Sequence, residues 1–117
     1  MAGMILYYYV NVPELPRAVQ HQSGSVEVIK FLVKEGDQVS AGTPLMQAEN
    51  WWAILEFDAV GAGVVSKTFF DRGTHVKINH PFAIILCNPE DRPRTEESSS
   101  VRIVQHVRHK PGFAHEP

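Results

Sequence analysis

Histidine and cysteine are the residue types in this chain that could bind a metal ion or act as a nucleophile, and there are six histidines and one cysteine. His106 and His109 have a spacing that brings two side chains to one helical face, but no carboxylate or cysteine lies nearby at ligand spacing. His75 and His80 fall in predicted surface loops. Cys87 ends an apolar run and is expected in the core. We therefore predict neither a metal site nor a Cys/His catalytic pair.

Carboxylates and glycines give no catalytic pattern either. Glu35 and Asp37 belong to a predicted turn and have no recognisable spacing for acid–base catalysis. Gly61 and Gly63 precede a predicted strand, whereas a phosphate-binding glycine loop leads into a helix. These residues predict a protein that is not an enzyme by itself.

Two adjacent tryptophans, Trp51 and Trp52, are the residues most suited to an interaction. Asn50 suits the first position of a type I turn, which would place both indoles at the turn's centre. Exposed aromatic side chains often mark contacts with partners, so the 50–53 hairpin is a candidate surface for a protein partner or for self-association. In the alternative interpretation, one indole folds back onto the loop 15–19 and caps the domain.

The composition indicates one domain without nucleic-acid or membrane partners. The chain has 117 residues, of which 44% are apolar, and a formal net charge of −2. That charge provides no basic surface for nucleic acid. The apolar run Met4–Val10 is too short to span a bilayer and lacks the flanks of a signal peptide. One cysteine fits a reducing cytoplasm, so we expect a cytoplasmic location.

The elements that must position these residues are β-strands. Short β-branched and aromatic runs, bounded by Gly, Pro, Asn or Asp, are Met4–Val12, Ser25–Lys34, Pro44–Glu49, Ala53–Phe57, Val64–Phe70 and Phe82–Cys87. They predict an all-β domain over residues 4–88. Residues 89–117 are rich in proline and charge, which predicts a flexible C-terminal tail. Within it, Val101–His109 fits a strand or a helix.

An internal repeat relates the two halves of the predicted domain at a shift of 37 residues. Its identical pairs are Val28/Val65, Lys30/Lys67, Gly36/Gly73, Val39/Val76 and Pro44/Pro81. Repeats this short rarely bury their own apolar face, so two copies are expected to pack about a pseudo-twofold axis. Gly36 and Gly73 suit turns that require φ > 0. Pro44 and Pro81 suit the first residue of a strand.

One ordered set of residues resembles the biotinyl/lipoyl-attachment family. The set is Val33-Lys34-Glu35-Gly36-Asp37-x-Val39-x-x-Gly42-x-Pro44-Leu45, then Glu49, then Ala59-x-x-Ala62-Gly63-Val64-Val65. The segment Val12-Pro13-Glu14-Leu15 is similar to the start of many lipoyl domains. The resemblance implies a barrel-sandwich hybrid, a flattened barrel of two quasi-symmetric four-stranded sheets. It also implies structural roles for Gly36, Gly42, Gly63 and Gly73 in the turns and repeats.

In that family an exposed β-hairpin presents one lysine, to which a ligase couples lipoate or biotin. The matching stretch here is Glu49-Asn50-Trp51-Trp52-Ala53. Glu49 and Ala53 match the lipoyl pattern, Gly63 keeps the same frame, and Trp52 takes the position of the lysine. An indole nitrogen is not a nucleophile for amide formation. The resemblance therefore implies that neither lipoate nor biotin is attachable at Trp52, and we expect no cofactor.

Three functions are compatible with these observations. The first is a non-modified lipoyl-like domain that serves as a protein-binding or assembly module through the Asn50–Ala53 hairpin. The second is a carrier domain of a 2-oxo acid dehydrogenase acyltransferase or of a biotin-dependent carboxylase, as the family resemblance implies. The third is a fragment of a membrane-fusion-protein adaptor. In such adaptors a long helical hairpin separates the half-motifs, whereas here the halves lie close together.

Overall fold

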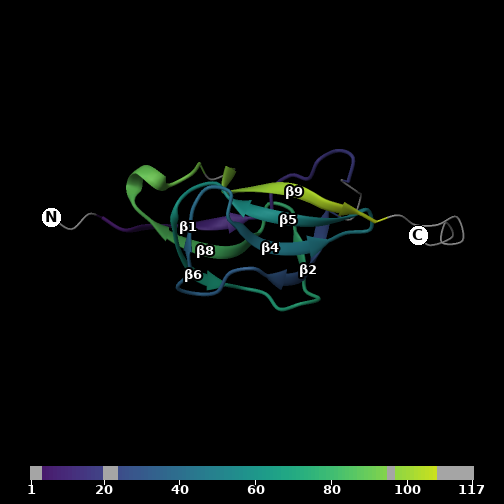
Figure 1. Cartoon of the computed structure of the whole chain (residues 1–117), viewed down its shortest axis with the longest axis horizontal. Coiled ribbons are helices and arrows are strands. Elements are labelled where there is room, and N and C mark those ends of the chain that lie inside the picture. The colour runs from purple at the N-terminus through teal and green to yellow at the C-terminus, as the bar shows by residue number, and fades with distance from the viewer. Residues whose placement is uncertain (1–3, 20–23, 95–96, 108–117) are drawn as a thin grey trace, which may run out of the picture.

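The computed structural model is all-β and consists of two antiparallel sheets (Figure 1). It describes residues 4–19, 24–94 and 97–107. In these residues the elements are β1 (Leu6–Asn11), β2 (Ser25–Phe31), β3 (Gln38–Val39), β4 (Pro44–Glu49), β5 (Ala53–Ala59), β6 (Gly63–Thr68), β7 (His75–Lys77), β8 (Pro81–Cys87), the 3₁₀ turn η1 (Pro89–Asp91) and β9 (Ser99–His106).

The strand order of the sheets is β1-β8-β6-β3 in one and β7-β2-β4-β5-β9 in the other. The prediction of a flattened two-sheet architecture is confirmed, and each of the six predicted strand runs overlaps an observed strand. The second sheet has five strands instead of the four predicted. Strands β3 and β7 escaped prediction because two and three residues are too few to show an alternating pattern.

Side-chain alternation explains why these segments pair into a two-sheet fold. In β5 the side chains of Ala53, Leu55 and Phe57 are fully buried, whereas those between them are half-buried. Phe57 packs against Phe82 of β8 with ring centroids 5.9 Å apart, so the core joins the two sheets. Within the described chain, no helix is long and apolar enough to cross a membrane.

The turns after β2 and β6 make the same hydrogen bonds 37 residues apart. Gly36 N–H donates to the carbonyl of Val65, and Gly73 N–H donates to the carbonyl of Val28, each over 2.8 Å. Both glycines have positive φ, 95° and 90°, which glycine adopts without strain. The two halves of the sequence thus interlock, since each turn bonds the strand of the other half.

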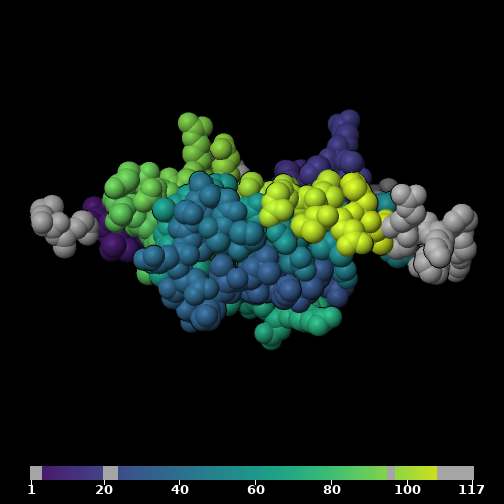
Figure 2. All heavy atoms as spheres, in the orientation of Figure 1, coloured from purple at the N-terminus to yellow at the C-terminus, as the bar shows by residue number. Residues whose placement is uncertain are grey.

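The predicted flexible tail is wrong for the stretch that forms β9. This strand pairs antiparallel with β5, from Ala53 opposite His106 to Ala59 opposite Ser99. Val101 and Ile103 pack against the core. Figure 2 shows β9, in yellow, lying against the neighbouring strands as part of one surface. Of the two alternatives for 101–109, the strand is the one observed, and residues 108–117 lie outside the described residues.

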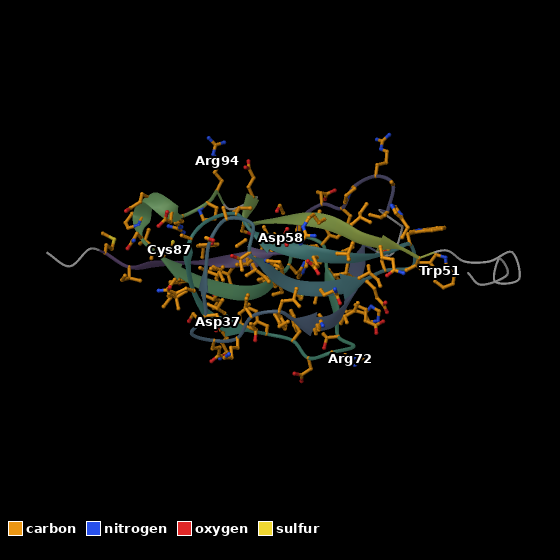
Figure 3. All side chains as sticks on the ribbon, viewed as in Figure 1. Asp37, Trp51, Asp58, Arg72, Cys87 and Arg94 are labelled. Atoms are coloured by element: carbon orange, nitrogen blue, oxygen red, sulfur yellow. The ribbon has the colours of Figure 1, made fainter. Side chains whose placement is uncertain are left out.

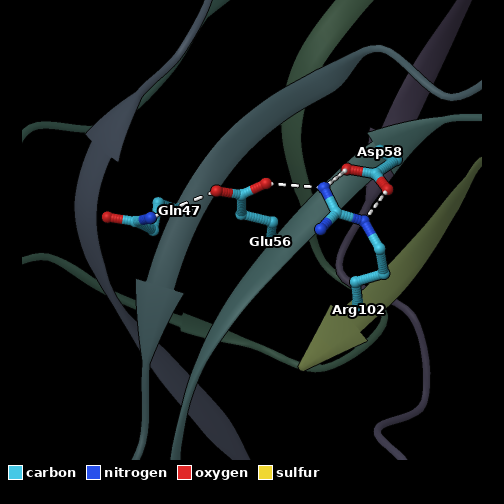
Figure 4. A network of polar contacts seen from close by, with 4 residues as sticks. All are labelled: Gln47, Glu56, Asp58 and Arg102. Atoms are coloured by element: carbon cyan, nitrogen blue, oxygen red, sulfur yellow. Dashed lines mark hydrogen bonds and ion pairs between the residues drawn. The ribbon is translucent and has the colours of Figure 1, made fainter. Parts of the chain in front are cut away.

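An ion-pair network fastens β9 to β5 (Figure 4). The Arg102 guanidinium donates to both carboxylate oxygens of Asp58, with Nε 2.8 Å from Oδ2, and to Glu56 Oε1 over 2.6 Å. These hydrogen bonds, first to Asp58 and then to Glu56, raise the pKa of Arg102 above its usual value. Gln47 of β4 donates to the other oxygen of Glu56. Asp58 is buried, and Arg102 is the cation that makes its burial tolerable.

Candidate functional site

The hairpin between β4 and β5 is closed by the side chain of Asn50. Its Oδ1 accepts hydrogen bonds from the backbone N–H groups of Trp52, at 2.8 Å, and Ala53, at 2.9 Å. The backbone N–H of Asn50 donates to the carbonyl of Ala53. An asparagine side chain that replaces a backbone acceptor in this way forms an Asx turn. The turn therefore holds the two tryptophans at the hairpin tip, as predicted.

Two further hydrogen bonds support the tip from behind. Asn50 Nδ2 donates to the carbonyl of Val19 over 2.6 Å, which ties the tip to the loop before β2. On the other side, the N–H of Val107 donates to the carbonyl of Trp52 over 2.8 Å. The hairpin is thus fixed by three separate segments of the chain. Its position does not depend on the β4–β5 pair alone.

The two indoles differ in exposure. Trp51 is half-buried, whereas Trp52 remains 36% exposed. Figure 3 shows Trp51 at one end of the barrel and Cys87 toward the other. The capping alternative predicts that an indole contacts the loop 15–19. The hydrogen bond to this loop is made by the side-chain amide of Asn50. The tip presents aromatic surface and carries no primary amine, because residues 50–53 include no lysine.

The four glycines singled out in the sequence meet two different requirements. Gly36, Gly42 and Gly73 have positive φ in turns. Gly63 instead begins β6, and a Cβ there would collide with the side chain of Ile85 and the carbonyl of Leu86. Gly63 therefore allows β6 to approach β8 closely, and this requirement is not visible in a turn pattern.

The other candidate residues are not brought together into a catalytic or metal-binding site. Cys87 is buried in the core, and burial raises the pKa of its thiol, which disfavours the reactive thiolate. His75 lies 3.6 Å from Glu27, and His80 caps a loop carbonyl. His109 lies outside the described residues. Among those that are described, no three metal-ligating side chains form a group that could hold an ion.

A feature that the sequence did not reveal is a groove along the outer edge of β1. It has a volume of about 580 Å³ and runs between β1 and the segment after η1. Its lining includes a tyrosine run, Tyr7 to Tyr9, and two arginines, Arg92 and Arg94. No short motif marks such a groove, because it depends on how the chain returns after β8.

Two interlocked antiparallel sheets thus form a small all-β domain that holds the hairpin tip in place. A family model described as "Biotin-requiring enzyme" matches residues 10–85, which is more than half of the chain. The chain belongs to this biotin/lipoyl family.

Curated relatives carry the same similarity. The chain is 36% identical over 75 residues to the dihydrolipoyllysine-residue acetyltransferase component of the pyruvate dehydrogenase complex of Zymomonas mobilis, covering 63% of this chain and 17% of that protein. It is 40% identical over 63 residues to the Rhizobium meliloti protein of that name, covering 53% and 14%. It is 39% identical over 62 residues to the pyruvate dehydrogenase E1 component subunit beta of Rhizobium meliloti, covering 52% and 14%. The chain spans less than a fifth of the length of these relatives.

Proposed function

We propose that this chain is a non-modified lipoyl-type domain that acts as a protein-binding or assembly module through its 50–53 hairpin. The observation that carries the proposal is a tip that is held rigidly yet presents indoles in place of an amine. Covalent attachment of lipoate or biotin requires a lysine ε-amine, and Trp52 takes that position in the family frame. The module itself then performs no catalysis and carries no cofactor.

The rigidity of the tip supports a binding role. Asn50 fixes the turn, and the bonds to Val19 and Val107 hold it from two sides. A turn whose backbone is fixed before binding loses little conformational entropy on binding, so Trp52, 36% exposed on this turn, is suited to anchor a partner. The relatives' names point to a component of a pyruvate dehydrogenase complex as the class of partner. One cysteine in the chain is consistent with a cytoplasmic location.

A carrier domain is the second candidate, favoured by the relatives named as dihydrolipoyllysine-residue acetyltransferases. Intact mass after co-expression with lipoate ligase and biotin ligase separates the two candidates. We expect the unmodified mass for this chain and a lipoyl adduct for the Trp52→Lys variant. An adduct on the unchanged chain would establish the carrier function instead. A folded Trp52→Lys variant without adduct would show that Trp52 does not hold the attachment position.

The binding role is tested by the double variant Trp51→Ala/Trp52→Ala. We expect it to lose association with pyruvate dehydrogenase complex purified from the same cells, or with a second copy in sedimentation velocity, while its circular dichroism stays unchanged. Leu32→Ala is the matched control, because Leu32 is 37% exposed in a different loop. Equal association by both variants would exclude the tip as the binding surface.

A further inference from the structure

Strand β1 is an outer strand whose second edge has no strand beside it in the described chain. If β9 is left aside, the two sheets follow the same plan, with the strand orders β3-β6-β8-β1 and β7-β2-β4-β5. The strands at the first three positions correspond in the repeat, because β3 and β7, β6 and β2, and β8 and β4 each lie about 37 residues apart. By this correspondence β1 and β5 are equivalent edges. Strand β9 pairs with the edge of β5, whereas no described strand pairs with the equivalent edge of β1.

The backbone groups on the outer side of β1 can be assigned from its hydrogen bonds. The backbone N–H of Val12 faces the β8 side and donates to the carbonyl of His80, the residue before β8. Asn11 points the other way: its N–H donates to Ser98 Oγ and its carbonyl accepts from Ser99 Oγ. Successive residues of a strand alternate in direction, so the N–H and C=O groups of Tyr7 and Tyr9 also face outward.

The outward groups of Tyr7 and Tyr9, unlike those of Asn11, have no protein partner among the described residues. The serine contacts cap only the Asn11 end of the edge, and no hydrogen bond is formed by the outer groups of Tyr7 or Tyr9 to any other described segment. An unpaired row of this kind is a template for an added strand. A groove of about 580 Å³ lies beside this row.

The charge of the residues that line the groove indicates which kind of peptide could bind there as an added strand. Arg92 and Arg94 line it, and neither forms an ion pair with another described residue. Figure 3 shows Arg94 projecting away from the barrel. Glu90, Asp91 and Glu97 of the same segment do not line this groove. Glu97 lines an adjoining hollow together with the same two arginines, and Asp91 lines a further hollow on the other side of Ile5. The lining is therefore aromatic and cationic.

We propose that the β1 edge binds an extended peptide with acidic side chains as an added strand. The peptide backbone pairs with Tyr7 and Tyr9, alternate side chains lie over the tyrosines, and acidic side chains meet Arg92 and Arg94. A second copy of the chain is a poorer occupant, because antiparallel pairing of two β1 strands brings the arginines of both copies to one junction. This surface is separate from the hairpin tip, so it stands or fails independently of the function proposed above.

The test uses a fluorescein-labelled peptide of alternating valine and glutamate, eight residues long, and the full chain. We expect saturable binding by fluorescence anisotropy, with the largest amide NMR shifts at Tyr7 and Tyr9. The Arg92→Ser/Arg94→Ser variant is expected to bind about tenfold more weakly. Arg72→Ser is the matched control, because Arg72 is an exposed arginine in a separate loop and should leave binding unchanged (Figure 3).

Two further probes separate strand addition from charge attraction. N-methylation of every second peptide amide removes the donors along one edge, so one of the two methylation patterns should abolish binding and the other should not. A peptide of alternating valine and lysine should not bind. No binding of the acidic peptide, equal binding of the lysine peptide, or indifference to both methylation patterns would overturn the proposal. Dimerisation of the chain with protection of the Tyr7 and Tyr9 amides would overturn it as well, in favour of a second copy.

Discussion

Strands β5 and β1 occupy equivalent edges of the two sheets, but their outer sides meet different neighbours. Against β5 lies β9, which runs the full length of the strand from Ala53 to Ala59. Among the described residues, the outer side of β1 is capped only at Asn11, by Ser98 just before β9 and by Ser99, the first residue of β9. One edge is thus covered by the chain itself, while the other borders a groove.

The difference lies in the outward residues rather than in the fold. Glu56 of β5 pairs with Gln47 of β4, and Tyr9 of β1 pairs with Ile84 of β8. Because Gln47 and Ile84 are related by the 37-residue shift of the repeat, Glu56 and Tyr9 occupy equivalent positions. Glu56 and its neighbour Asp58 attract the Arg102 of β9. Tyr9 offers no charge, and the cations at its edge come from the segment after η1. The same scaffold therefore selects a basic strand at one edge and, as proposed, an acidic one at the other.

Removal of β9 is the strongest way to break the comparison, because it makes β5 as open as β1. A chain that stops after Arg94 loses the packing of Val101 and Ile103 and the ion pair between Arg102 and Asp58. We expect the free energy of unfolding to fall by about 3 kcal/mol. Urea denaturation measures this, and exposed β5 edges should also promote aggregation.

The matched control stops after Val107 and removes only residues that follow β9. It should unfold at the same urea concentration as the full chain. If the chain that stops after Arg94 were equally stable, β9 would contribute nothing, and residues 89–117 would behave as the flexible tail that their composition predicts.

Amide hydrogen exchange compares the two edges without a mutation. The outward amides of β5, at Ile54 and Glu56, face β9, whereas those of β1, at Tyr7 and Tyr9, face the groove. We expect the two β1 amides to exchange on the order of a hundredfold faster, because an unpaired edge needs no opening of a neighbouring strand. Equal protection in the free chain, measured by NMR, would show that the β1 edge is already occupied.

The ion pair of β9 is tested by Arg102→Leu, which keeps the strand but leaves Asp58 without its cation. A buried carboxylate without a partner is costly, so we expect the melting temperature to fall by about 5 °C. Arg94→Leu is the control, since no described residue forms an ion pair with Arg94. A similar small loss in both variants would mean that apolar packing alone holds β9 in place.

Much of the scaffold was predictable because its signals are local. The alternation in β2 and β5, the prolines that begin β4 and β8, and the glycines in the turns at 36 and 73 each follow from a short run of sequence. The hairpin tip was predictable for the same reason, since Asn50 supplies its own turn acceptor.

The features that escaped prediction depend on distant residues. Strand β9 lies in a segment rich in proline and charge, and it pairs with β5 and bonds Arg102 to Asp58, 44 residues earlier in the chain. The alternation of Val101 and Ile103 around Arg102 was visible, but so short a run also fits a helix. The groove at β1 likewise arises from the return of the chain after β8, which no local pattern records.

The inner sides of the two edges also differ, and Tyr8→Phe tests that difference. Tyr8 of β1 pairs with Ile85, and Leu55 of β5 pairs with Ala48, which is 37 residues before Ile85. Tyr8 and Leu55 therefore occupy corresponding core positions. The Tyr8 hydroxyl is buried and has no hydrogen-bond partner among the described residues. Removing an unpaired buried hydroxyl relieves its desolvation, so we expect the variant to gain up to about 1 kcal/mol of stability at pH 7.

The alkaline pH dependence provides a second measurement on the same variant. Burial raises the pKa of Tyr8 from 10.0 to about 12 in the folded chain. Above pH 10 the phenol ionises more readily in the unfolded chain than in the folded one. The free energy of unfolding is therefore constant with respect to this group below pH 10 and decreases as the pH rises from 10 towards 12. The Phe variant should lose less stability over this interval, whereas Tyr9→Phe, at an exposed position, should follow the unchanged chain. A Tyr8→Phe variant that is less stable at pH 7 would show that the hydroxyl has a partner, and the core of β1 would then be as fully satisfied as that of β5.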